Sequence, residues 1–526
     1  MKPYFGLTGG WLTFWLTVAC ATNMALFGYD QGVFSGVVVS DNFLITLGLV
    51  NNPSLIGTIS ALFDVGSFFG AVLTLFIGGL LGRKKTLLLG TSIMILGVCL
   101  QTAASTISVM IAGRIVTGLG NGLNCATAPV WQSETSSAEM RGKLIILQLI
   151  MCVVGFSICN WLNFGLAFVN GSFAWRFPLA FQLIFLFTIW ATTPWLPESP
   201  RWLISKGRVD EAKQIIADLE AVHYDHPHVA RESQRIEGAI VFERENEPSF
   251  LDILLNRTRS HSGTCATRRL ILAMATLAMK ELTGINVTSY YLPTLLTSSV
   301  GLSNTMARLI TSLNTISYLI ASFFGIPLIE RWGRRKMMIV GAAGQAFSHI
   351  MICICIRIKE LPSETHQTEA AKASIAFFFL YYVFFAIGWQ GIPYLYPTEI
   401  NSLAMRTKGV ALSTATSWAF NFMGKSLITR IVVQITPIGI SSIRWRFYII
   451  WAVCNAVFIP TIYFLYPETS NRTLEDIDKF FRENHDPLVF RYDEAVSVKR
   501  PARYHLEDQI ELDGKESEKA EVQHCE

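Results

Sequence analysis

The feature that most constrains this chain is a series of long, uninterrupted apolar stretches. About 20 apolar residues in a helix are enough to cross the hydrocarbon of a bilayer, which is about 30 Å thick. Composition agrees, because 51% of the 526 residues are hydrophobic and only 16% are charged, a balance unsuited to a soluble surface. We therefore predict an all-α polytopic membrane protein with twelve transmembrane helices near residues 11–39, 54–78, 85–103, 107–130, 143–167, 177–196, 270–298, 306–329, 337–356, 373–397, 409–436 and 445–466.

The charged connections between these stretches occur twice along the chain. The first half carries Gly82-Arg83-Lys84-Lys85, Glu134, Arg141 and Pro197-Glu198, and the second carries Gly333-Arg334-Arg335-Lys336, Glu399, Arg406 and Pro467-Glu468. In both halves the central Glu and the following Arg lie seven residues apart. Such a repeat predicts two pseudo-symmetric six-helix bundles, a design typical of carriers that rock around a central site.

The repeat also predicts how the chain is divided. We expect five parts: a short N-terminal segment 1–10, a bundle 11–196, a linker 197–268, a second bundle 269–466 and a tail 467–526. Within the linker, 208–220 has the pattern of an amphipathic helix. The end of the tail, 500–526, is charged and poor in aromatic residues, so we expect it to be disordered.

Basic residues predict the orientation in the membrane. Lys and Arg in short loops favour the cytoplasmic side, and they gather in the connections after spans 2, 4, 8 and 10. Both termini and the linker are therefore expected in the cytoplasm, with the plasma membrane as the expected location. Asn170-Gly171-Ser172 falls in an external loop, where glycosylation of Asn170 is expected.

The remaining bulk features argue against other classes of function. A net charge of +4 fits the loop bias and gives no reason to expect nucleic acid as a partner. Ten Cys residues are scattered without the spacing of a zinc site or a disulfide framework. Because no nucleophile–base constellation or phosphate loop is evident, we expect neither enzyme activity nor a cofactor or metal. The expected partners are a small solute and the lipid bilayer, with no obligate protein partner.

Charges inside the spans are costly and invite a functional explanation. Asp30 in span 1 and Arg114 in span 4 lie at similar depth, counted at 1.5 Å per residue. A buried Asp facing an Arg can alternate between paired and protonated states, which couples a proton to conformation. A permanent structural salt bridge is the alternative. Asp64 in span 2 lies at the same depth, and position alone does not separate the two aspartates.

Span 4 also contains Gly118, Gly120 and Gly122. A dinucleotide-binding loop is excluded, because these glycines lie in an apolar helix and follow no strand. Close packing against a neighbouring helix is the expected reason for them.

The motifs together resemble the sugar porters of the major facilitator superfamily, particularly fungal hexose and polyol proton symporters. The resemblance covers about residues 10–480 and depends on six motifs in order: Gly28-Tyr29-Asp30-x-Gly32-Val33, Arg114-x3-Gly118-x-Gly120-x-Gly122, Pro197-Glu198-Ser199-Pro200-Arg201-Trp202-Leu203, Leu282-Thr283-Gly284-x-Asn286-x3-Tyr290-Tyr291, Glu330-Arg331-x-Gly333-Arg334-Arg335 and Pro467-Glu468-Thr469.

The resemblance implies roles for individual residues. Members with Asp at the Gly-Tyr-Asp position are typically proton symporters, which favours Asp30 over Asp64 as the coupling residue, working with Arg114. The family's cytoplasmic charges form a gate that latches the two bundles in the outward-facing state. Here they are Arg83, Glu134, Arg141, Glu198, Arg334, Glu399 and Arg406.

The departures from the family pattern concern the solute. The paired Gln of span 7 that bind sugar are Lys280 and Glu281 here, and because adjacent helical residues point about 100° apart, these two need not bond each other. The usual Trp of span 10 is Tyr394, and the span-5 Gln position has Gln148 one residue out of register. The expected solute-binding residues are Gln148, Lys280, Glu281, Asn286, Tyr290, Tyr291, Tyr394, Trp418 and Asn421.

These inferences predict a proton-coupled symporter that carries a monosaccharide, a hexose or pentose, across the plasma membrane by alternating access. Its only coupling partner is the proton. Glycerol or another polyol, and a quinate-like anion attracted by Lys280, are alternative solutes. A non-transporting nutrient sensor on the same fold is the alternative from another class of function.

Overall fold

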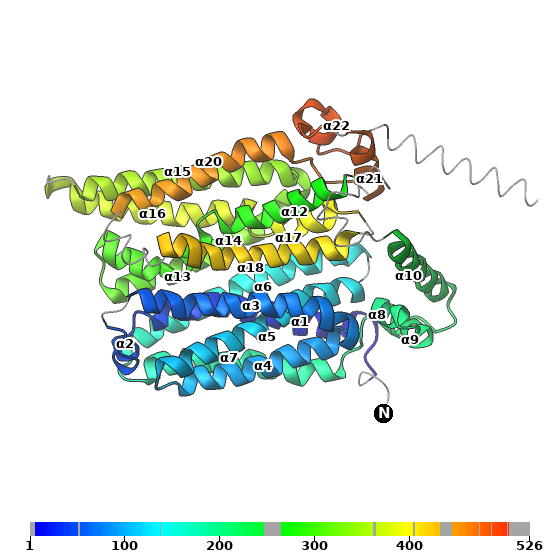
Figure 1. Cartoon of the computed structure of the whole chain (residues 1–526), viewed down its shortest axis with the longest axis horizontal. Helices are drawn as coiled ribbons and strands as arrows, with labels where there is room; N and C mark the ends of the chain where they lie inside the picture. The colour runs from blue at the N-terminus through cyan, green and yellow to red at the C-terminus, as the bar shows by residue number, and fades with distance from the viewer. Residues whose placement is uncertain are drawn as a thin grey trace, which may run out of the picture.

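The computed structural model describes residues 6–501 and 503, apart from 51–52, 137, 247–264, 361–363, 403–404, 432–443, 473 and 485. These residues form helices and turns, with no β-strand in the described ranges. Figure 1 shows long helices side by side in two groups, blue to cyan for the N-terminal half and green to orange for the C-terminal half. The predicted all-α fold of two related bundles is confirmed.

The N-terminal bundle contains one helix for each of the first six predicted spans. They are α1 (Gly9–Val37), α3 (Pro53–Leu81), α4 (Arg83–Ala103), α5 (Ile107–Thr135), α6 (Ala138–Gly165) and α7 (Phe173–Thr192), with the short α2 (Asp41–Thr46) after α1.

The C-terminal bundle differs from the sequence prediction in two spans, 7 and 10, each of which is divided in two. Span 7 is α12 (Ala266–Glu281) followed by α13 (Ile285–Leu295), and span 10 is α16 (Glu364–Gly388) followed by α17 (Ile392–Ile400). The undivided spans are α14 (Asn304–Arg331), α15 (Arg334–Lys359), α18 (Arg406–Ile431) and α20 (Phe447–Leu465).

Nine helices in the described part of the chain are long and apolar enough to cross a membrane. Three other predicted spans are not among these nine. α5 carries Arg114 with several buried amides and hydroxyls, span 7 is divided into helices of 16 and 11 residues, and α18 contains Asn421 and Lys425 among several Ser and Thr residues. Large apolar side chains such as Phe76, Leu96 and Phe324 are more than half exposed on the outer faces of the helices. Such faces suit hydrocarbon as the surrounding medium.

The glycines of α5 allow close packing on two sides. A Cβ at Gly118 would lie 2.1 Å from the carbonyl oxygen of Phe63 in α3, and one at Gly120 would lie 2.4 Å from that of Gly90 in α4. Glycines two apart therefore serve opposite faces, and each lets a neighbouring backbone approach. The packing role predicted for them is confirmed.

The helices outside the bundles lie at one end of the molecule. α8 (Pro200–Ser205), α9 (Val209–Glu220) and α10 (Pro227–Asn246) follow the first bundle, and α21 (Leu474–Glu483) and α22 (Asp493–Val496) follow the second. Figure 1 places both groups beyond the right-hand end of the helices, where α4 and α15 begin. We call this the basic end, because α4 and α15 open with Arg83-Lys84-Lys85 and Arg334-Arg335-Lys336.

Two of these helices dock by an apolar face. In α9, Ala212, Ile215 and Ile216 are buried, as the amphipathic pattern of 208–220 predicts. In α21, Phe480 and Phe481 are buried within the core of the C-terminal bundle. The first part of the tail is therefore packed against the bundle, while almost all of 500–526, predicted to be disordered, lies outside the described residues.

Candidate functional site

The break in span 7 determines where its polar residues point. α12 ends at Glu281, and Gly284 adopts φ +96°, a left-handed conformation that glycine reaches without steric cost. The carbonyl oxygen of Thr283, freed by the break, accepts hydrogen bonds from Asn455 Nδ2 at 3.1 Å and Tyr381 Oη at 3.4 Å. Because these partners satisfy the carbonyl that the break leaves without a helical hydrogen bond, an interrupted helix is tolerated inside the bundle.

Lys280 and Glu281, at the end of α12, form an ion pair. Lys280 Nζ donates to Glu281 Oε1 at 2.9 Å and to Tyr394 Oη at 3.2 Å, and it lies 5.0 Å from the centroid of the Tyr394 ring. The sequence did not require this bond between neighbours, since adjacent side chains on a helix diverge. Because α12 ends at Glu281, however, the side chain of Glu281 can turn toward Lys280.

Two further helical segments hold the Glu281 carboxylate. Asn286 Nδ2, in the first turn of α13, donates to Glu281 Oε2 at 2.7 Å. Ser417 Oγ, in α18, donates to Glu281 Oε1 at 2.5 Å. Only 3% of the Glu281 side chain is exposed, against 12% for Lys280. The carboxylate is thus held by three donors, and the Lys280 side chain is the more exposed member of the pair.

The structure brings four predicted solute residues into direct contact, namely Lys280, Glu281, Asn286 and Tyr394, and we call them with Ser417 the span-7 cluster. Sequence reasoning missed Ser417. Its signal was its spacing, since it precedes Asn421 by four residues and therefore shares one face of α18 with it.

The other predicted solute residues lie around this cluster or outside it. Trp418 in α18 contacts Phe27 in α1 edge to face, with ring centroids 5.8 Å apart, so the two halves meet beside the cluster. Asn421 is 5% exposed, and its Oδ1 has no hydrogen-bond partner among the described residues. Gln148 instead donates to Gln132 within the N-terminal bundle, at 3.4 Å. The side chains of Tyr290 and Tyr291 lie outside the described residues.

Asp30 and Arg114, the predicted coupling pair, are both buried in the N-terminal bundle, each 1% exposed. Oδ2 of Asp30 has no hydrogen-bond partner in the part of the chain that the structure describes, and Arg114 is the charged group that acts on Asp30 electrostatically. The Arg114 guanidinium carbon lies 4.1 Å from the centroid of Phe34 and 4.9 Å from that of Phe63. These rings stabilise the cation without neutralising it.

Asp64, the other candidate, is also fully buried, on α3. The Arg114 guanidinium bonds the same helix through its backbone, at 3.5 Å to the carbonyl oxygen of Ile59 and 3.4 Å to that of Ser60. Arg114 therefore lies between α1 and α3. The assignment of Asp30 as the coupling residue stays a prediction.

At the basic end, the predicted gate residues form ion pairs within each half. Arg83 Nε and Nη2 each donate to Glu134 at 2.9 Å. Arg334 donates to Glu399 in the same bidentate way, at 3.1 and 2.7 Å. The side chains of Arg141 and Arg406 lie outside the described residues. A latch between the halves stays a prediction.

The remaining acid of the repeat in each half, Glu198 and Glu468, acts as a helix cap. Glu198 accepts the backbone N–H groups of Arg83 at 2.9 Å and Lys84 at 3.3 Å, at the start of α4. Glu468 accepts those of Arg334 at 2.8 Å and Arg335 at 3.1 Å, at the start of α15. A carboxylate at a helix N-terminus satisfies orphan donors and complements the helix dipole.

The glycine that precedes each capped helix is required by the same arrangement. Gly82 has φ +87° and Gly333 has φ +81°. A Cβ at Gly82 would lie 2.6 Å from Oε2 of Glu198, and one at Gly333 would lie 2.3 Å from Oε2 of Glu468. The repeated Gly-Arg and Pro-Glu motifs are therefore two parts of one cap, formed by segments far apart in the sequence.

At the opposite end, the two halves are bonded directly to each other through α6 and α14. Arg308 Nη1 donates to the carbonyl oxygen of Asn163 at 3.1 Å, Ser312 Oγ to that of Asn160 at 2.9 Å, and Thr315 Oγ1 to Ser157 Oγ at 3.1 Å. Nearer the middle of the spans, Gln390 Nε2 donates to the carbonyl oxygen of Leu149 at 3.3 Å. We call the bonds made by Arg308, Ser312 and Thr315 the α6–α14 seam.

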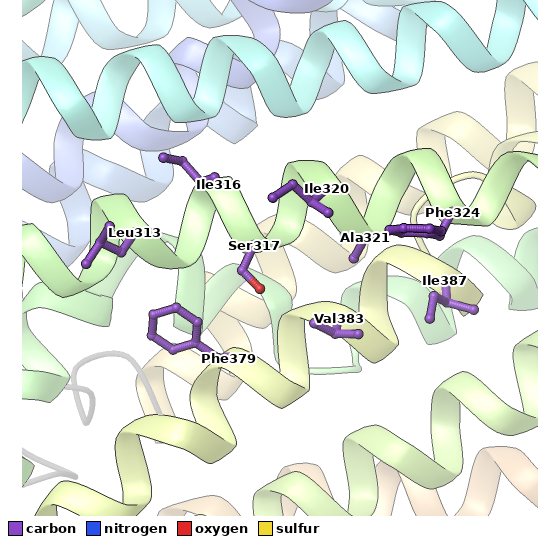
Figure 2. A pocket seen from close by; sticks show the side chains of 9 residues that line it. All are labelled: Leu313, Ile316, Ser317, Ile320, Ala321, Phe324, Phe379, Val383 and Ile387. Atoms are coloured by element: carbon purple, nitrogen blue, oxygen red, sulfur yellow. The ribbon is translucent and has the colours of Figure 1, made fainter.

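Two other features lie apart from the polar site. A groove between α14 and α16 is lined by apolar side chains, Ile320, Phe379 and Val383 among them, and by one hydroxyl, that of Ser317 (Figure 2). Asn170, the predicted glycosylation position, is exposed in the connection before α7.

No group of three His, Cys, Asp or Glu side chains that could hold a metal occurs within the described ranges.

Comparisons with known proteins agree with this architecture. The family model described as "Sugar (and other) transporter" matches residues 15–481. The MFS-type transporter oryC of Aspergillus oryzae is 51% identical over 514 residues, 97% of this chain and 93% of that protein. The sugar transporter STL1 of Saccharomyces cerevisiae is 34% identical over 92% of this chain and 84% of its own length.

Among solved structures, the proton:xylose symporter XylE of E. coli has a similar fold. In a form bound to 6-bromo-6-deoxy-D-glucose it matches with a TM-score of 0.73 at 20% identity, over 89% of this chain and 99% of that one. At that identity the likeness is one of fold.

Proposed function

Because the chain belongs to the sugar (and other) transporter family, we propose that this multi-pass membrane protein is a proton-coupled symporter of a small polyhydroxylated solute, a monosaccharide foremost. The observation that carries proton coupling is Asp30, a carboxyl group buried in a membrane-spanning bundle with one oxygen unpaired among the described residues. A permanent structural ion pair would satisfy that oxygen. A carboxyl group that must take up and release a proton during each transport cycle needs an oxygen that is free to bind that proton.

The span-7 cluster supports a hydroxylated solute. It combines hydrogen-bond donors and acceptors from both sides of the break in span 7 with the aromatic ring of Tyr394, which follows the break in span 10. Sites at broken helices near the middle of the membrane are typical of secondary transporters. The relative described as a sugar transporter supports the same class of solute.

The contacts between the halves support alternating access. The α6–α14 seam joins the halves at one end, while the gate ion pairs at the basic end close within each half. With the basic end in the cytoplasm, as the positive-inside rule favours, the seam lies on the outer side of the membrane. Rocking the bundles would break the seam and bring the gate residues of the two halves together. The plasma membrane is the proposed location.

The test is uptake in a transporter-deficient yeast host. Labelled D-glucose, D-xylose and glycerol are supplied with and without a protonophore, to wild type, Asp30→Asn and Asp64→Asn. We expect wild type to concentrate at least one solute and to lose this ability with the protonophore. Asp30→Asn should lose accumulation but keep solute exchange across a preloaded membrane, whereas Asp64→Asn should keep both.

Each contrary result has a definite meaning. Accumulation by Asp30→Asn at the wild-type level would refute the assigned proton carrier. Loss of accumulation in Asp64→Asn alone would move that role to Asp64. Wild-type uptake that equilibrates without concentrating and ignores the protonophore would refute symport.

A further inference from the structure

The charge of Lys280 is compensated inside the span-7 cluster before any solute arrives. Its ammonium lies 2.9 Å from Glu281 Oε1, so the pair carries no net charge. An isolated Lys at this point of the membrane would attract acidic solutes, and that attraction is the basis of the quinate-like alternative. The position of Glu281 argues against it.

Glu281 is held so that this compensation persists. Asn286 of α13 and Ser417 of α18 bond its two oxygens at 2.7 and 2.5 Å. These donors lie on different helical segments from Lys280, and the side chain is almost fully buried. The carboxylate therefore does not swing away when something approaches Lys280.

An acidic solute at Lys280 would meet this carboxylate. Nζ has three N–H groups, two of which are given to Glu281 and Tyr394, and the third is left for a solute oxygen. A solute carboxylate accepting it would lie within about 6 Å of the Glu281 oxygens, where repulsion offsets much of the attraction to Lys280. The remaining gain does not repay the desolvation of an anion, whereas a hydroxyl can accept the same bond at little cost.

Asn421 points to a hydroxylated solute, without distinguishing a neutral sugar from a sugar acid. Its Oδ1 is buried with no hydrogen-bond partner among the described residues, one turn after Ser417. An unpaired acceptor requires a donor, which a solute hydroxyl supplies, so the selection by charge rests on Lys280 and Glu281.

We propose that Glu281 is a specificity-determining positioning residue: by compensating Lys280 it makes the site accept neutral polyhydroxylated solutes and reject sugar acids and hydroxy acids. This inference deepens the proposed function and rests on it for the location of the solute. It makes a prediction about charge selectivity that binding alone can test, without transport.

The experiment uses the full chain purified into nanodiscs and measures binding by calorimetry at pH 6. D-glucose and D-glucuronate are the probes, because they differ in the carboxylate. We expect Glu281→Gln, which keeps the side chain's shape, to raise the affinity for glucuronate at least about tenfold over wild type, since an uncompensated charge at about 4 Å is worth more than this factor. The double variant Lys280→Gln/Glu281→Gln should show no gain, and Glu281→Asp should reject glucuronate as wild type does.

A mirrored variant keeps the test decisive if Glu281→Gln does not fold. Lys280→Gln leaves the carboxylate uncompensated, so we expect it to gain at least about tenfold for D-glucosamine, a cationic sugar, relative to wild type. Equal glucuronate affinity in Glu281→Gln and in the double variant, with no glucosamine gain in Lys280→Gln, would overturn the proposal, as would a wild type that prefers glucuronate to glucose. If the variants showed these affinity gains but wild type failed to take up solute, the proposed transport function would be refuted and the role of Glu281 in charge selectivity would stand.

Discussion

Removing the charge of one helix cap should destabilise the protein far more in the second half than in the first. Glu468 is 1% exposed and accepts four backbone N–H groups, those of Arg334, Arg335, Thr469 and Ser470, at 2.8 to 3.1 Å. Glu468→Gln keeps one oxygen and turns an NH2 group toward backbone donors.

The size of the effect follows from these contacts. A hydrogen bond to a charged group contributes about 1.5–3 kcal/mol, and a negative charge at a helix N-terminus adds about 0.3–1 kcal/mol. Loss of one bond and of the charge therefore predicts a decrease of about 2–4 kcal/mol in the free energy of unfolding. Glu198 is partly exposed and its Lys84 contacts are long, at 3.3 Å, so Glu198→Gln should cost about half as much or less.

The assay is the thermal unfolding midpoint of each variant in the same detergent, with retention of the monodisperse state checked first. Glu211→Gln, on the exposed surface of α9, is the control and should change the free energy by no more than about 0.5 kcal/mol. If Glu198→Gln lowered the midpoint as much as Glu468→Gln, or if Glu468→Gln matched the control, the reasoning from burial and hydrogen-bond length would be wrong.

Two further changes test other parts of the structure. Gly82→Ala should lower the free energy of unfolding by at least about 1–2 kcal/mol, because its φ is positive and the added Cβ would also lie 2.6 Å from Glu198 Oε2. Gly79→Ala, where a Cβ meets no atom within 4 Å, should be neutral or stabilising. Thermal unfolding of the two variants would contradict this if their order were reversed. Arg308→Ala removes a charged bond across the α6–α14 seam, so we expect a cysteine engineered at Ser157 to be alkylated about tenfold faster, and an unchanged rate would show that the seam does not hold this end closed.

The number and approximate position of the membrane helices could be predicted from the sequence, because both depend on local apolar length. The packing role of the α5 glycines was also predictable, because it follows from their spacing within one apolar helix. The breaks in spans 7 and 10 were not, because hydropathy does not report where the backbone leaves the helical path. Gly284 marked one break only once its φ value and the Thr283 carbonyl's partners were known.

The candidate site, too, could be predicted from the sequence only in part. Lys280, Glu281, Asn286 and Tyr394 were identified by comparison with a family pattern, but the sequence did not predict that they touch. Their contact requires α12 to end at Glu281, and α17 and α18 to pack beside that end. Ser417 belongs to no motif, and its spacing from Asn421 gained meaning only through its bond to Glu281.

The sequence by itself determined that this chain fills a bilayer with two related sets of helices and repeats one set of charged connections in each. Only the tertiary structure decided what those connections do, since Gly82 and Glu198, or Gly333 and Glu468, are brought together by folding over more than a hundred residues. The physical reason is that apolar length and glycine spacing are properties of a segment, whereas a cap, an ion pair or a seam needs two segments whose meeting depends on the packing of all the others.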